Sequence, residues 1–139
     1  MHKPAYEVLR KKHKLPSFDV INADFHISAI ESEVNVLSEI RTKAEDKIDY
    51  LLHLLNAVLQ PEPTSLADLY EYNALNTAQR TCALSVFKQL MIVKCVLSEA
   101  EIIGAEQVTA LAICTAHKAL TEKKKDLLEL LKLFKEYWQ

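Results

Sequence analysis

Apolar residues recur along the chain at alternating steps of three and four, the spacing of one helix face. The run extends from Ser17 to Gln60, and its positions are Val20, Ala23, Ile27, Ile30, Val34, Leu37, Arg41, Ala44, Ile48, Leu51, Leu55 and Val58. All but Arg41 are apolar, as in the seam of a helix that packs at a shallow angle on a neighbour. The pattern predicts one helix over residues 17–60, with Ser17 as its N-cap and a possible bend or break at 22–24.

The end of this helix is marked by two prolines. Pro61 and Pro63 cannot donate a hydrogen bond to a helix, so they stop it. A short helix is then expected to begin at Thr64 or Ser65 and to carry Leu66, Leu69 and Tyr70.

Two further long helices are expected, over residues 77–103 and 105–138. Asn76 and Gln79 have the spacing of an N-cap and its return contact. Gly104 lies where a helix C-terminus favours a left-handed residue, although a kink in one continuous helix is the alternative. These elements predict an all-α fold, an antiparallel bundle of three long helices with a short extra helix in the first connection.

Composition narrows the function classes. The chain has 139 residues, half of them hydrophobic, and Gly104 is its only glycine. Dinucleotide and phosphate-binding loops need several glycines, because the backbone must turn with positive φ or approach a phosphate closely. Such sites are therefore excluded. The length suits one domain, which we expect over residues 17–139 after a basic N-terminal arm at residues 1–16.

Charge is unevenly distributed. The first 16 residues carry a net charge of +4 and the remainder −6. A basic arm on an acidic body can contact nucleic acid or another partner, fold back onto its own acidic helices, or remain a solvated tail. The cations that would make such contacts are Lys3, Arg10, Lys11, Lys12 and Lys14.

Location is indicated by the cysteines and by the lengths of the apolar runs. Cys82, Cys95 and Cys114 are an odd set without a Cys-x-x-Cys pair, typical of buried thiols in a reducing compartment. The longest uncharged runs are shorter than the ~18 residues expected of a membrane span. We therefore expect a cytoplasmic protein with no membrane role.

Candidate metal and catalytic groups are sparse. Asp46, Asp49 and His53 share one helix face, but that face lies outside the seam, so a solvated stripe is expected. Cys114 and His117 are three residues apart, yet no second pair completes the four ligands of a zinc site. We expect Cys114 to be buried and His117 to lie near the surface. No cofactor, metal or catalytic residue is predicted, and a metal-carboxylate enzyme is the least favoured function.

Two charged residues occupy seam positions that are otherwise apolar. Arg41 and Lys123 can lay their aliphatic stems along the core and fix the register of packing. Glu45, one turn after Arg41, is the expected partner of that guanidinium. An anion site at Arg41 inside the bundle is the alternative.

Association is the function that the apolar pattern favours. The helix from Cys82 to Ala100 is apolar around most of its circumference, so a monomer would leave Met91 and Ile92 partly exposed. A leucine-rich cluster at 127–134 is similarly broad. Large exposed apolar faces are typical of interfaces. We predict a non-enzymatic interaction or assembly module, a homodimer or the partner of another helical protein.

The connection before this helix adds a second candidate surface. Its residues are Tyr70, Glu71, Tyr72 and, one turn into the next helix, Arg80. Long connections often carry function, but the same residues can simply cap the core.

Overall fold

The computed structural model describes residues 1 and 3–139 and is all-helical, which confirms the predicted class. Helices account for 82% of these described residues. In chain order the elements are α1 (Lys3–His13), α2 (Phe18–Phe25), the short 3-10 helix η1 (Ile27–Ala29), α3 (Val36–Leu59), α4 (Leu66–Tyr72), α5 (Thr77–Ile103) and α6 (Glu106–Trp138).

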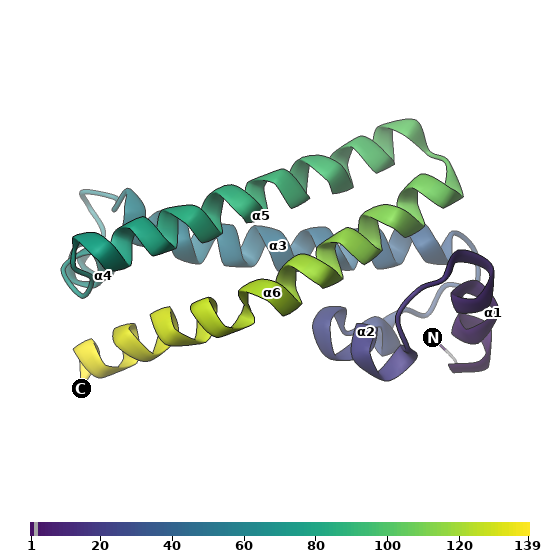
Figure 1. Ribbon diagram of the computed structural model, residues 1–139, viewed down its shortest axis with the longest axis horizontal. Helices are drawn as coiled ribbons and strands as arrows, with labels where there is room; N and C mark the ends of the chain where they lie inside the picture. Colours follow the sequence, from purple (N-terminus) through teal and green to yellow (C-terminus); the bar gives the residue numbers. More distant parts are fainter. Residues whose placement is uncertain (2) are drawn as a thin grey trace.

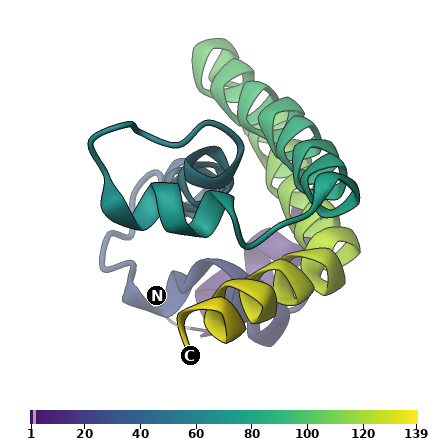
Figure 2. The same cartoon turned by 90° about the vertical axis from the view of Figure 1, so that its left-hand side faces the viewer.

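The three longest helices lie lengthwise beside one another (Figure 1). α5 packs along both α6 and α3, and α3 also packs on α6. Their facing sides bury a continuous apolar core that includes Ile48 of α3, Leu90 and Leu97 of α5, and Ile113 of α6. α1 and α2 gather at the end where α5 turns into α6. α4 lies across the opposite end, against α3 (Figure 2).

The expectation of one unbroken helix over residues 17–60 is wrong. α2 ends at Phe25, and α3 begins only at Val36. His26 and Asn35 adopt left-handed backbone, with φ of 56° and 57°, which interrupts the helical ladder on both sides of η1. The side chain of Asn22 accepts a hydrogen bond from the Ser28 N–H at 2.8 Å and so stabilises this turn. The break thus comes directly after residues 22–24, where the sequence allowed a bend or break.

The misleading feature was the apolar seam itself. Ile27 and Ile30 are buried, but from the 3-10 helix and the segment after it rather than from one long helix. Val34 and Val20, also in the seam, are exposed. An apolar side chain can be buried in the core whether it comes from a continuous helix or from two helices joined by a turn. The spacing of apolar residues alone therefore does not distinguish these two arrangements.

Helix ends were predicted more accurately, because capping is local. α5 begins with the expected box, in which Asn76 Oδ1 accepts from the Gln79 N–H at 2.8 Å and Gln79 Oε1 accepts from the Asn76 N–H at 2.9 Å. Ser65 caps α4 through its hydroxyl oxygen. α3 ends at Leu59, directly before the prolines.

Gly104 ends α5 in left-handed backbone with φ of 74°, and its N–H donates to the Ala100 carbonyl at 2.9 Å. The chain then enters α6 at Glu106, so Gly104 marks a reversal and not a kink in one helix.

We expect Gly104→Ala to lower the free energy of unfolding by about 1 kcal/mol, because a Cβ is disfavoured in left-handed backbone. A Cβ at this position would meet no atom within 4 Å, so backbone strain is the whole effect. Gly104→Asn is the matched control and should lose less, since asparagine tolerates this conformation. Urea unfolding measures both. Equal stability of the alanine variant and the native chain would contradict the assigned turn.

Candidate interaction surfaces

The basic segment at residues 1–16 is a folded part of the molecule and not a solvated tail. Its residues 3–13 form α1, whose Tyr6 is fully buried against the body. The Tyr6 ring meets Phe18 of α2 edge-on at 5.7 Å, and its hydroxyl donates to the Pro16 carbonyl at 2.6 Å. The N-terminal amine of Met1 also donates to the Ser28 carbonyl at 3.0 Å. The segment therefore folds back onto the chain, one of the expected alternatives.

Three of the five cations in this segment face carboxylates of the same chain. Lys3 lies 3.6 Å from Asp19 of α2, Arg10 lies 2.9 Å from Glu7, and Lys12 lies 3.3 Å from Glu106 at the start of α6. Lys11 and Lys14 are exposed, and Lys14 stands in left-handed backbone just after α1. These contacts leave less free positive charge for an external phosphate than the sequence suggested.

Burial of Tyr6 leads to a pH prediction. Desolvation raises the pKa of the Tyr6 phenol well above its ordinary value. Above about pH 10 the unfolded chain loses this proton while the folded chain retains it, so stability must fall as pH rises. We expect Tyr6→Phe to weaken this alkaline loss, whereas Tyr50→Phe, at an exposed position, should leave it unchanged. Urea unfolding from about pH 8 to 11 measures it; identical pH slopes for native chain and Tyr6→Phe would contradict the assignment.

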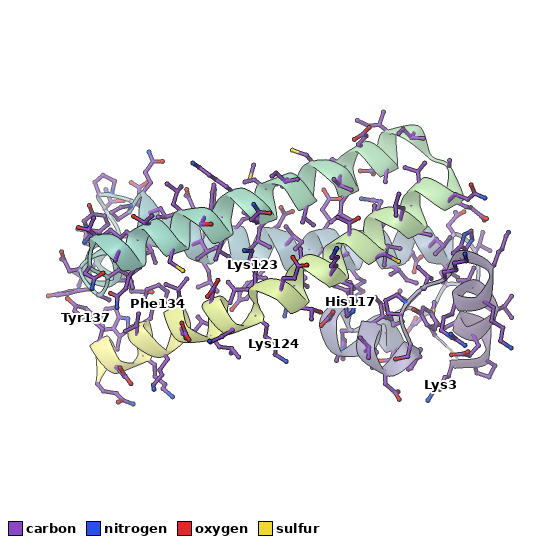
Figure 3. All side chains as sticks on the ribbon, in the orientation of Figure 1. Lys3, His117, Lys123, Lys124, Phe134 and Tyr137 are labelled. Carbon is purple, nitrogen blue, oxygen red and sulfur yellow. The ribbon has the colours of Figure 1, made fainter. Side chains whose placement is uncertain are left out.

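The predicted surface around Tyr70 forms a small aromatic cluster at the α4 end. Tyr70 meets Trp138 of α6 edge-on at 5.6 Å. The Arg80 guanidinium lies 4.0 Å from the centre of the Tyr72 ring and donates to the Tyr72 carbonyl at 2.9 Å. Burial and the nearby Asp68 raise the pKa of Glu71. Phe134 and Tyr137 point from the last turns of α6 towards this end (Figure 3).

These contacts are internal, since they join α4, the start of α5 and the end of α6. Capping of the core accounts for most of the cluster, although Tyr70 is still 46% exposed. The role of Tyr70, Glu71, Tyr72 and Arg80 in partner binding stays a prediction.

The outward face of α5 is a separate surface. Met91 and Ile92 lie 38% and 57% exposed, as the sequence predicted for a chain on its own. Leu84, Cys95 and Ile102 are exposed on the same helix. Helical spacing places Leu84, Met91, Cys95 and Ile102 along one stripe, with Ile92 on its flank. α5 therefore presents a largely apolar face to solvent along most of its length, interrupted by Lys88 and Glu99.

α5 is also, within residues 1 and 3–139, the helix long and apolar enough to cross a membrane by length and composition. Only 28% of its most apolar stretch is buried in the molecule. This low burial agrees with the exposed apolar side chains on the outer face of α5, since a core helix of the same composition would be covered on most sides.

Arg41 lies in the seam of α3 as predicted, and it is almost fully buried. Its guanidinium donates to Glu45, the expected partner, and to the Thr42 hydroxyl at 3.1 Å, while Glu101 of α5 lies 3.5 Å away. Two carboxylates thus occupy the positions that an anion would need. The contact to Glu101 also joins α3 to α5, which supports the register role. Lys123 is half-buried on α6 and leaves the helix on the opposite side from Lys124 (Figure 3).

Within the described part of the chain, no three His, Cys, Asp or Glu side chains gather closely enough to hold a metal ion. Asp46 and His53 are exposed, whereas Asp49 is half-buried and pairs with Lys94 of α5 at 2.7 Å. Cys114 is half-buried, and burial raises the pKa of its thiol. The expected outer stripe on α3 is therefore partly an interhelical contact.

One polar pair was not predicted from the sequence. His117 Nδ1 of α6 lies 2.5 Å from Asp24 Oδ2 of α2, and both side chains are half-buried. His117 is labelled in Figure 3, where α6 passes α2. The pair ties α2 to the middle of α6. The two residues are 93 positions apart, and neither belongs to a local motif, so only the fold brings them together.

A surface hollow of about 530 Å³ has His13 of α1 and Cys114 of α6 in its lining, although no hydrogen bond joins these two side chains among the described residues. Two further hollows hold no such cysteine–histidine pair. One of about 260 Å³ lies between α2, α3 and α6, where Lys47 and Lys124 flank Leu51, Leu127 and Leu131. Another of about 400 Å³ lies between α1 and the turn at Gly104. In neither lining does a serine or threonine hydroxyl hydrogen-bond to a carboxylate, the pairing of nucleophile and base that covalent catalysis needs.

The comparisons with known proteins give no outside guide to function. The chain was compared with models of protein families, with curated proteins and with solved structures, and nothing matched. Among the surfaces described above, the outer face of α5 has exposed apolar side chains from Leu84 to Ile103.

Proposed function

We propose that this protein is a non-enzymatic helical assembly module that associates with itself as a homodimer. The observation that carries the proposal is the apolar outer face of α5, whose Ile92 and Ile102 are 57% and 86% exposed. An isolated chain gains nothing from such a face, whereas a second copy covers it and removes apolar surface from water.

In this proposal the three long helices act as an antiparallel bundle and form the scaffold. α3 and α6 cover the inner side of α5, and the buried Arg41 links α3 to Glu101 at the far end of α5. The scaffold holds α5 straight and leaves its opposite side free. A rigid helix is a good recognition element because little conformational entropy is lost when it binds.

Two further features support this reading. All three cysteines are free thiols, consistent with a reducing compartment such as the cytoplasm. Nucleic-acid binding through the basic segment has less support, because Lys3, Arg10 and Lys12 already face carboxylates. In this proposal the ion pairs of the basic segment serve mainly to hold α1, which lies within that segment, against the body.

The test compares two substitutions at matched exposure. Ile92→Glu on α5 should weaken dimerisation at least about 100-fold, since each dimer would lose two apolar side chains from its interface and would desolvate two carboxylates. Leu128 on α6 is 56% exposed, close to Ile92, and Leu128→Glu is the control that should leave dimerisation unchanged. Sedimentation velocity over a concentration series gives both dissociation constants. Loss of the dimer in Leu128→Glu with retention in Ile92→Glu would overturn the α5 assignment.

A further inference from the structure

The outer stripe of α5 has a symmetric arrangement of residue types. In chain order it reads Leu84, Lys88, Met91, Cys95, Glu99 and Ile102, all exposed. Leu84 and Ile102 each lie nine residues from position 93, and Met91 and Cys95 each lie two residues from it. The stripe therefore has apolar ends, an apolar centre and one charge of each sign between them.

The two charges have no partner within the chain. Among residues 1 and 3–139, no oppositely charged side chain lies within 4.0 Å of Lys88 or Glu99. On α5 itself, the residues three and four positions before and after Lys88 are uncharged, and the same holds for Glu99. By contrast, Lys94, on the inner flank of the same helix, pairs with Asp49.

From this arrangement we propose that two copies of the chain pack through α5 in antiparallel register, about a two-fold axis level with Val93. Leu84 then lies opposite Ile102 of the second copy, Met91 opposite its Cys95, and Lys88 within reach of its Glu99. The inference rests on the proposed function, to which it adds the geometry of the interface. A two-fold axis makes each of these contacts twice.

Charge selects this orientation over the parallel one. A parallel pair of α5 helices would set Lys88 against the second Lys88, and Glu99 against the second Glu99. Like charges facing each other across a helix interface disfavour that arrangement, whereas the antiparallel register pairs opposite charges. Insertion of the same face into lipid would bury both charges without partners, which is costly. A single helix face is a small interface, so we expect a dissociation constant in the micromolar range.

The first test exchanges the charges. Lys88→Glu and Glu99→Lys should each weaken the dimer by about tenfold, since each creates two like-charged contacts in the dimer. The double variant Lys88→Glu/Glu99→Lys restores opposite charges and should return the dissociation constant to within about threefold of the native value. Both residues are exposed and lack intrachain partners, so the folded subunit should be unaffected.

The second test uses Cys95, which lies about 3 Å along the helix from the axis. In a Cys82→Ala/Cys114→Ala background, a short bis-maleimide should link two Cys95 thiols into a covalent dimer. Substitution of the two half-buried thiols leaves the exposed Cys95 as the only cysteine of this variant. The control moves the thiol to the outside of α6 with Cys95→Ser/Lys118→Cys and should give no covalent dimer.

The outcomes separate this inference from the proposed function. Rescue by the double variant together with Cys95 crosslinking supports the antiparallel register. A dimer without rescue or crosslinking overturns the register and leaves self-association standing. A monomer at every concentration overturns both. A monomer that floats with neutral phosphatidylcholine vesicles overturns both as well and assigns the face to lipid.

Discussion

Replacement of Tyr6 by alanine is expected to lower the free energy of unfolding by about 3–5 kcal/mol, the range for truncation of a buried aromatic residue. Tyr6 has no exposed surface, and it joins α1 to Phe18 and to the Pro16 carbonyl. The substitution removes the ring and leaves that carbonyl without its donor. For a domain whose total stability is about 5–15 kcal/mol, this is a large loss.

The control lies on the same helix. Val8 is 68% exposed, so Val8→Ala should change the free energy of unfolding by less than about 0.5 kcal/mol. Urea unfolding followed by circular dichroism measures both variants. If Tyr6→Ala were as stable as Val8→Ala, α1 would not be packed on the body, and the basic segment would again be available as a free arm.

The second large effect is expected at Leu97, in the middle of the scaffold. Leu97 is fully buried on the inner face of α5, which packs against both α3 and α6. Leu97→Ala should destabilise the chain by about 2–5 kcal/mol through lost apolar burial and the cavity left behind. The same truncation at Leu111, which is 68% exposed on α6, should cost less than about 0.5 kcal/mol.

Chemical denaturation distinguishes these cases, and the result also bears on function. If Leu97 and Leu111 responded equally, the inner face of α5 would not be the covered one. The assignment of Met91 and Ile92 to the outer face would then lose its basis, because the two faces are defined by one helical periodicity.

The features predicted correctly from sequence are those that depend on neighbours in the chain. The Asn76–Gln79 box and the left-handed Gly104 involve residues within four positions of each other, so their physics is visible locally. The inner face of α5 was likewise predicted from helical spacing. The partial exposure of Met91 and Ile92 was predicted because α5 has more apolar residues than one buried face can hold.

The helix α1 in the N-terminal segment was not predicted, because the net positive charge of residues 1–16 led to the prediction of a basic arm. Tyr6 and Leu9 are three residues apart, a spacing that places both side chains on one face of a short helix. That periodicity was the signal for α1. Whether such a face is covered depends on α2 and α6, which are set by the rest of the fold.

Two features required the tertiary structure. The sequence allowed a bend or break at 22–24, but the full interruption between α2 and α3 depends on left-handed backbone at His26 and Asn35, residues that also fit inside a helix. The His117–Asp24 pair depends on α2 folding back onto α6, and no spacing within either helix records it. Each reflects long-range packing that overrides local preference.

The most direct test of self-association is sedimentation equilibrium of the native chain between about 1 and 100 μM, the range that brackets a micromolar dissociation constant. We expect an apparent mass that rises with concentration from 15.8 kDa towards twice that value. A constant mass of 15.8 kDa across the range would contradict it.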